Sequence, residues 1–334
     1  MTTKIFFASN QIARATTEQL QRMLDRFHLG RLISSEKPNH GVMGQTLFVS
    51  STGGEFVLKG NPLFEGQFIE EKFFVQNLHE RTHVPVPTPY LVDESTDIFG
   101  WSYSLMPRLP GAHLHAPELQ AKLSTADRMR IAESLAETLA EMHTWQTREF
   151  GEFDPRREVV RPFQSSYKVW LYRRIRYWLE DARKYSQISP KDVKWVEGIL
   201  EKAEQAFENL TSSSFVMGDF KPDNFLLEHD ADGWHVSGVF DFTTAYFGDP
   251  IADLPRMTAT YLDSGEVDLA KRFLSVYLSH STERDGFIER FTVHMLHQRV
   301  LDWGCAWAIN QVTWDTHLSF SDWAKPFIDI SAHV

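Results

Sequence analysis

Short apolar segments separated by turn signals make up the first third of the chain. Residues 46–50 and 55–59 are apolar runs of strand length around a Gly-Gly turn, a pattern typical of a β-hairpin. Residues 65–80 carry apolar side chains at helical spacing, and residues 90–92 and 101–106 are two more strand candidates. The order strand, strand, helix, strand, strand predicts a small antiparallel sheet with one helix.

Helical patterns dominate after about residue 124. Ser124 and Asp127 match a capping box at the start of a helix that reaches about residue 143. Three further helices are predicted: 165–184, the segment that follows Ser189-Pro190, and 291–309.

One β-rich island, residues 215–242, interrupts this helical part. The chain therefore predicts an α+β fold with two lobes: a small N-terminal antiparallel sheet plus one helix, and a larger, mainly helical C-terminal lobe. We place the boundary after residue 108, which assigns residues 1–108 to the first lobe and residues 109–334 to the second.

The composition excludes several classes of protein. The 334 residues carry 34 Lys and Arg against 45 Asp and Glu, a net charge of −11 that argues against general binding of nucleic acid or anionic membranes. Hydrophobic residues make up 42% of the chain, and no run approaches ~18 apolar positions, so we expect neither disorder nor a membrane span. With one cysteine, Cys305, and only a short apolar run near the N-terminus, we expect a cytoplasmic protein without internal disulfides. The oligomeric state stays open.

The β-rich island holds the residues that point to chemistry. Asp219 and Asn224 lie five positions apart in a loop, and Asp241 ends an apolar strand that a hairpin would bring beside that loop. Transfer of a phosphoryl group from a nucleotide requires a carboxylate that accepts the proton of the acceptor hydroxyl, and hard oxygen ligands for Mg²⁺. The pattern predicts Asp219 as the base and Asn224 and Asp241 as the metal ligands. The alternative is that Asp219 and Asn224 only cap turns.

The same segment matches the signature of a family. Asp219 and Asn224 are followed in order by Asp241 and by Gly248-Asp-Pro-Ile-Ala-Asp253. In these motifs the chain resembles the aminoglycoside phosphotransferase and choline kinase superfamily, which has a protein-kinase-like fold. The length and the long insertion before Met217 resemble the antibiotic phosphotransferases of the hygromycin type. Met217 itself stands where the family has a His, a departure that we interpret as a change in packing.

The resemblance implies a Mg²⁺-dependent phosphotransferase that moves the γ-phosphate of ATP or GTP to a hydroxyl group of a small molecule. Residues 1–108 would bind the nucleotide, and residues 109–334 would hold the catalytic and acceptor sites. Lys221 resembles a lysine that neutralises charge on the transferring group, and a solvated surface lysine is the alternative. Asp253 resembles the family aspartate that braces the catalytic loop through backbone hydrogen bonds.

The resemblance also assigns phosphate contacts to the N-terminal lobe. Lys59 ends the strand 55–59, like the strand lysine that contacts the α- and β-phosphates in kinases. Its ion-pair partner would be Glu71 on the following helix, because the family's acidic residue precedes a Leu by seven and Leu78 lies there. Glu70 is the rival.

The segment that joins the lobes resembles the hinge that binds the purine base. Leu105, Met106 and Arg108 would present backbone groups to the base, with Met106 or Arg108 as the donor because Pro107 has no N–H. ATP and GTP both stay open as donors. Residues 39–46 take the place of the loop that covers the phosphates, and an ordinary turn is the alternative.

The acceptor site is expected among the C-terminal helices. Asp302 and Asp315 lie among tryptophans, and carboxylates beside aromatic faces suit a hydroxyl compound that is cationic. The alternative is that Trp303, Trp307 and Trp314 pack a helix into the core.

Two other functions fit the same residues. A kinase of the choline, homoserine or fructosamine type would use the same catalytic group on a different acceptor. The change at Met217 also allows a pseudokinase that binds a nucleotide without turnover.

Overall fold

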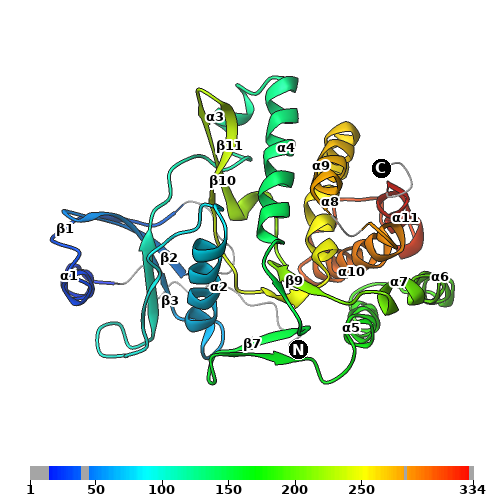
Figure 1. Cartoon of the computed structure of the whole chain (residues 1–334), viewed down its shortest axis with the longest axis horizontal. Helices are drawn as coiled ribbons and strands as arrows, with labels where there is room; N and C mark the ends of the chain where they lie inside the picture. The colour runs from blue at the N-terminus through cyan, green and yellow to red at the C-terminus, as the bar shows by residue number, and fades with distance from the viewer. Residues whose placement is uncertain (1–14, 39–44, 282–283, 331–334) are drawn as a thin grey trace.

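The N-terminal lobe is a five-stranded antiparallel sheet with the helices α1 (Thr17–Arg26) and α2 (Gln67–Arg81) beside it (Figure 1). The computed structural model describes residues 15–38, 45–281 and 284–330. The strands follow the order β1-β2-β3-β5-β4, with the bounds Leu32–Glu36 (β1), Gln45–Ser51 (β2), Gly54–Gly60 (β3), Leu91–Asp93 (β4) and Tyr103–Pro107 (β5). The expected hairpin is β2–β3, and the expected helix is α2 (Gln67–Arg81).

Helix α1 (Thr17–Arg26) was not expected, although its signals are in the sequence. Thr16 and Gln19 form a capping box, and the buried side chains of Leu20, Met23 and Leu24 recur at helical spacing. These side chains pack with the inner residues of the sheet in a core that belongs to the small lobe alone.

Helix α2 belongs to the small lobe in sequence but packs into the core of the large lobe. Its buried Phe74, Val75 and Leu78 join the same apolar cluster as Leu135 and Phe215 of the C-terminal lobe. This arrangement fixes α2 between the two lobes and thereby sets the position of every polar residue that it carries.

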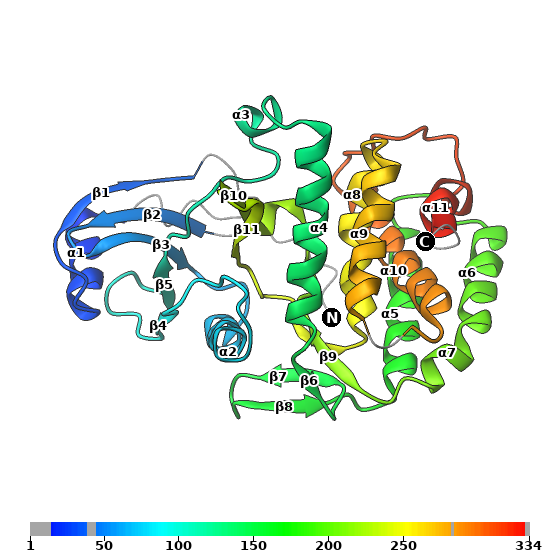
Figure 2. The same cartoon turned by 45° about the horizontal axis from the view of Figure 1, so that its top comes forward.

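The C-terminal lobe is mainly helical (Figure 2). Its helices are α3 (Pro117–Gln120), α4 (Thr125–Met142), α5 (Tyr167–Ala182), α6 (Pro190–Lys202), α7 (Glu204–Glu208), α8 (Leu254–Asp263), α9 (Val267–His280), α10 (Phe287–Ala308) and α11 (Phe320–Asp329). The predicted capping boxes at Ser124 and Ser189 are present. The predicted apolar stripe after Ser189 is divided at Ala203 into α6 and α7.

Two β structures lie within this lobe. One is the hairpin β10 (Phe225–Asp230) and β11 (Gly233–Val239). The other is a sheet of order β6-β9-β12-β7-β8, with the bounds Gln146–Thr147 (β6), Gly151–Asp154 (β7), Val159–Pro162 (β8), Ser213–Val216 (β9) and Tyr246–Gly248 (β12). Strands β6 to β8 were not predicted, because they are only two to four residues long and β6 and β7 pair with strands far along the chain.

The α+β fold class and the two unequal lobes are confirmed. Within the described ranges, no helix combines the length and apolar character that crossing a bilayer requires.

Candidate active site

The loop that follows strand β9 is held by a buried aspartate. Asp253, in the 3₁₀ turn η3 (Pro250–Asp253), accepts hydrogen bonds from the backbone N–H groups of Met217 and Gly218, both at 2.7 Å. The Nε2 atom of His143, which follows helix α4, lies 3.1 Å from the same carboxylate. The expected brace is therefore confirmed. Met217 is fully buried, in agreement with a packing role at that position.

Asp219 lies at the centre of a group of donors. Its Oδ2 accepts from the Asn224 side-chain amide at 3.1 Å and is 2.8 Å from the Lys221 ammonium. Its Oδ1 is 2.9 Å from the Nε of Arg256, on helix α8. A carboxylate has about four acceptor positions, and three are occupied here, so one remains on Oδ1 for a hydroxyl group.

Asp241 follows strand β11 in a conformation that few side chains adopt. Its φ is 70°, in the left-handed region, and the turn aims its carboxylate back at the N-terminal lobe, where Oδ1 is 3.4 Å from the Lys59 ammonium. Thr243 donates to the same oxygen at 2.7 Å. The positive charge of Lys59 outweighs burial and lowers the pKa of Asp241, so the carboxylate stays ionised. The backbone N–H of Phe240 donates to the Asn224 carbonyl at 3.1 Å, which keeps Asp241 and Asn224 together.

Lys59 forms its ion pair with Glu71, at 2.8 Å, rather than with Glu70. Burial alone would lower the pKa of Lys59, but the negative charges of Asp241 and Glu71 raise it above its ordinary value. Glu71 is 1% exposed and also accepts from Tyr90 and Thr243, each at 2.8 Å. The ammonium group of Lys59 is therefore fixed between the two lobes.

The predicted hinge residues lie in and just beyond strand β5. Leu105 and Met106 are buried and pair with Leu58 and Val57 of β3. The backbone N–H of Arg108 donates to the Glu55 carbonyl at 2.9 Å, so this N–H is not free for a purine base. The predicted phosphate-covering loop falls largely on residues 39–44, which lie outside the described residues.

The two predicted acceptor aspartates make local hydrogen bonds, Asp302 in helix α10 and Asp315 in the loop between α10 and α11. Asp302 accepts from Gln298 at 2.9 Å and from Arg299, and Asp315 accepts from the backbone N–H of His317 at 2.9 Å. Neither aspartate contacts Asp219 within the part of the chain that the structure describes.

The surrounding tryptophans pack on one another. Trp303 is buried, and its ring stacks on that of Trp314 with centroids 5.4 Å apart. Trp307 also contacts Trp303, with centroids 6.0 Å apart. These contacts agree with the packing role for the three residues.

Four residues of this site were missed in the sequence: Tyr90, His143, Thr243 and Arg256. Thr243 follows Asp241 by two positions, so the sequence could have indicated that it lies near this predicted metal ligand. For Tyr90, His143 and Arg256 the sequence carries no signal, because each meets its partner only through tertiary packing.

Comparison with known sequences gives a family and two distant relatives. A model of the phosphotransferase enzyme family matches residues 35–287. Acyl-CoA dehydrogenase family member 10 of Mus musculus is 23% identical over 229 residues, which are 67% of this chain and 20% of that protein. Family member 11 of Rattus norvegicus is 25% identical over 229 residues, which are 66% of this chain and 27% of that protein. The match thus spans only about a fifth to a quarter of these relatives.

Comparison with solved structures gives the fold. A Ralstonia eutropha protein classed with the aminoglycoside phosphotransferases has a TM-score of 0.64 at 19% identity, over 96% of this chain and 98% of that one. A GDP and kanamycin complex of APH(2″)-IIIa has a TM-score of 0.62 at 15% identity, over 95% and 98%. A thermostable mutant of APH(4)-Ia with ADP and hygromycin B has a TM-score of 0.59 at 15% identity, over 94% and 98%. The chain therefore has the protein-kinase-like fold of these enzymes.

Proposed function

The chain belongs to the phosphotransferase enzyme family, and from this premise we propose that it moves the γ-phosphoryl group of ATP or GTP to a hydroxyl group of a small molecule, with Mg²⁺. The observation that carries the proposal is one continuous group of charged and polar residues across the two lobes. It runs from Asp219 and Asn224 through Asp241 to Lys59 and Glu71.

Asn224 and Asp241 would hold the metal ion. The Asn224 amide nitrogen donates to Asp219, which leaves its amide oxygen for a cation, and the Asp241 side chain is 42% exposed. Two hard oxygen donors suit Mg²⁺, which takes few protein ligands and completes its shell with water and phosphate oxygens. When bound, the ion would offset negative charge on the phosphates.

The chain's own residues would orient and activate the acceptor. Asp219 would accept the hydroxyl proton at the free position of Oδ1, while Asn224 and the Asp253 brace keep the carboxylate in place. Lys59, fixed by Glu71, would bind phosphate oxygens of the nucleotide. Lys221, 2.8 Å from Asp219, would add positive charge near the transferring group.

The purine base would bind at the predicted hinge of Leu105, Met106 and Arg108. The Arg108 N–H already donates to Glu55, and Met106, two residues earlier on the same edge of β5, pairs with Val57 of β3. Neither of the two expected donors is therefore free in this conformation. A nucleotide donor is also consistent with the cytoplasmic location expected from the sequence.

The acceptors to test first are aminoglycosides, because enzymes of similar fold are solved with hygromycin B and kanamycin. Asp302 and Asp315 stay as proposed contacts for a cationic acceptor, and choline, homoserine and fructosamine are the alternative acceptors. The Asp253 brace and the Lys59–Glu71 pair are both formed without the usual loop His, which favours an active enzyme over a pseudokinase.

The test is phosphate transfer from Mg·ATP and Mg·GTP to a panel of these acceptors. We expect Asp219→Asn to lower kcat by about 10²- to 10⁴-fold, the usual contribution of a positioned base. Asp232→Asn, the same change at the exposed tip of the β10–β11 hairpin, is the matched control and should keep full activity. Wild-type protein that binds Mg·ATP yet turns over no faster than Asp219→Asn on any acceptor would refute the proposal.

A further inference from the structure

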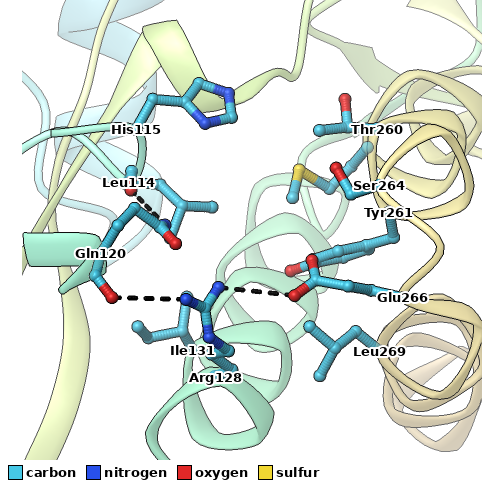
Figure 3. A pocket seen from close by; sticks show the side chains of 11 residues that line it. Leu114, His115, Gln120, Arg128, Ile131, Thr260, Tyr261, Ser264, Glu266 and Leu269 are labelled. Atoms are coloured by element: carbon cyan, nitrogen blue, oxygen red, sulfur yellow. Dashed lines mark hydrogen bonds and ion pairs between the residues drawn. The ribbon is translucent and has the colours of Figure 1, made fainter. Parts of the chain in front are cut away.

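A cavity lies in the C-terminal lobe, between α3–α4 and α8–α9 (Figure 3). Its volume is about 190 Å³. Pockets for drug-sized ligands are usually larger, at about 300–1,000 Å³, so this one has room for a single small ring rather than a whole oligosaccharide.

The cavity begins one helical turn from Arg256, the residue of α8 that contacts the proposed base. Thr260 lines it, and Arg256, four positions earlier on the same face of α8, contacts Asp219 at 2.9 Å. On the opposite wall, the segment before α3 packs on the strand that leads to the metal ligands, with the His113 ring 5.9 Å from Phe240. A molecule in the cavity would thus lie on the acceptor side of the catalytic group.

The two charged side chains of opposite sign that line the cavity pair with each other. Arg128 and Glu266 lie on opposite sides of it and form an ion pair at 3.4 Å, and Arg128 also donates to the Gln120 carbonyl at 3.4 Å (Figure 3). Glu266 is the one carboxylate among the residues described as lining it, and it already has a counter-ion. An ammonium group would therefore find no unpaired negative charge there.

One buried hydroxyl group that lines the cavity has no hydrogen-bond partner among the described residues. Tyr261 is 3% exposed, and within the described residues its hydroxyl makes no hydrogen bond. Figure 3 shows this hydroxyl directed into the space between α4 and α8. A buried hydroxyl without a partner is unfavourable, and a bound molecule with a hydroxyl or ether oxygen would satisfy it.

The rest of the wall combines apolar and hydroxyl side chains. Leu114, Ile131 and Met257 offer apolar contact, and Ser264 offers a hydroxyl group. The Thr260 hydroxyl donates to the Arg256 carbonyl at 3.0 Å, so it offers its oxygen as an acceptor. Such a wall suits a ring whose faces carry C–H groups and whose edge carries hydroxyl groups.

We propose that the cavity binds an uncharged, polyhydroxylated ring that forms part of the acceptor. The inference rests on the proposed phosphotransferase function and names the chemistry of its acceptor. The ring in the cavity positions a neighbouring part of the molecule, whose hydroxyl group reaches Asp219. A neutral ring is therefore preferred in this cavity over an aminated one.

The binding test uses saturation-transfer NMR on the full chain, with D-glucose and myo-inositol as neutral probes and D-glucosamine as the cationic one. We expect the neutral probes to bind and glucosamine to bind more weakly. Tyr261→Phe should weaken the binding of the neutral probes about fivefold, which corresponds to the loss of one hydrogen bond. Ser264→Trp should abolish their binding, because the larger side chain fills the cavity. The thermal midpoint of ligand-free Tyr261→Phe should not fall, because its hydroxyl has no bond to lose.

The matched control is Tyr172→Phe. The Tyr172 hydroxyl donates to the Leu200 carbonyl at 2.7 Å, and Tyr172 does not line the cavity. This variant should lose stability but keep probe binding. The proposal is overturned when no neutral probe binds, when glucosamine binds better than glucose, or when Ser264→Trp leaves binding unchanged.

A transfer assay separates this inference from the proposed function. If neutral rings bind in the cavity but no hydroxyl compound is phosphorylated, the function is wrong and the cavity stands as a binding site. If an acceptor is phosphorylated with the same kcat/KM by wild type, Tyr261→Phe and Ser264→Trp, the function stands and the cavity proposal is wrong.

Discussion

At the scale of single residues, the arrangement of the proposed catalytic residues depends on Glu71. Its buried carboxylate accepts hydrogen bonds from four side chains: Lys59, Gln67, Tyr90 and Thr243. The family resemblance, with Leu78 seven positions later, predicted Glu71 rather than Glu70 as the partner of Lys59, and the ion pair forms there. Tyr90 and Thr243 could not be predicted as partners, because 19 and 172 positions separate them from Glu71 and local periodicity carries no information at that range.

We expect Glu71→Gln to lower kcat with little change in fold. The substitution keeps the shape of the side chain but removes the charge that fixes the Lys59 ammonium. Loss of one charge-assisted bond costs about 2–3 kcal/mol, or about 30- to 150-fold in kcat. Steady-state kinetics with Mg·ATP check this, with Glu80→Gln at the exposed end of α2 as the control. A kcat equal to that of the control would show that Glu71 has no part in catalysis.

The raised pKa of Glu70 predicts that the stability of the protein depends on pH. Burial, together with the negative charges of Glu152 and Glu71, raises the pKa of Glu70 to about 8. Between the ordinary pKa of a glutamate, about 4.3, and this value, the folded chain holds a proton that the unfolded chain has released. The free energy of unfolding therefore decreases as the pH rises through this window.

Glu70→Gln removes this dependence. The variant should gain about 1–2 kcal/mol over wild type at pH 8.5 and little at pH 5, after allowance for the partial exposure of the site. Chemical denaturation at the two pH values measures the difference. Equal gains at both values would mean that Glu70 is not protonated in the folded protein.

At the scale of elements, the β7–β8 hairpin holds helix α2 in place. The ring of Phe153, on β7, stacks on Phe73 of α2 with centroids 4.0 Å apart and also contacts Phe74. Arg156, in the turn of the same hairpin, pairs with Glu65 just before α2 at 2.6 Å. Because α2 carries Glu71, this contact between the lobes sets the geometry of the catalytic group. The hairpin was not predicted, because the elements that it contacts are distant from it in the sequence. The same long-range contacts allow it to hold α2 in place.

Phe153→Ala should therefore affect both stability and activity. Truncation of a buried aromatic side chain costs about 3–5 kcal/mol, and looser packing of α2 should lower kcat as well. Val159→Ala, at a half-exposed position of the adjacent strand β8, is the control and should change neither quantity by much. If Phe153→Ala lowers stability while kcat stays at the wild-type value, the hairpin does not position α2 for catalysis.

At the scale of the whole molecule, the two lobes share one core. The apolar cluster of the C-terminal lobe includes Phe74 and Leu78 of α2 and also Val84 and Val86, which precede the predicted hinge. The core that belongs to the N-terminal lobe alone is much smaller. The predicted boundary after residue 108 therefore cuts through this shared packing.

We expect the full chain to unfold in one calorimetric transition, and residues 1–108 alone to remain unfolded. The fragment would expose the apolar face of α2 and keep only the small core, which gives too little buried area for a stable domain. Circular dichroism of the fragment during urea titration checks this. A cooperative transition in the fragment would contradict the expectation.

The sequence by itself determined what depends on neighbours along the chain. The spacing of Asp219 and Asn224, the capping box at Ser124 and the β2–β3 hairpin are local patterns, and each appears where it was predicted. Only the tertiary structure decided which distant groups meet. It placed Arg256 beside Asp219. Among the described residues, it gave the Tyr261 hydroxyl no hydrogen-bond partner, and it paired the charged side chains Arg128 and Glu266 that line the same cavity. A single sequence gives the types of residues that are present. The distances between residues that are far apart in the sequence follow from how the helices and sheets pack. Those distances decide which acceptor can bind beside the proposed catalytic residues.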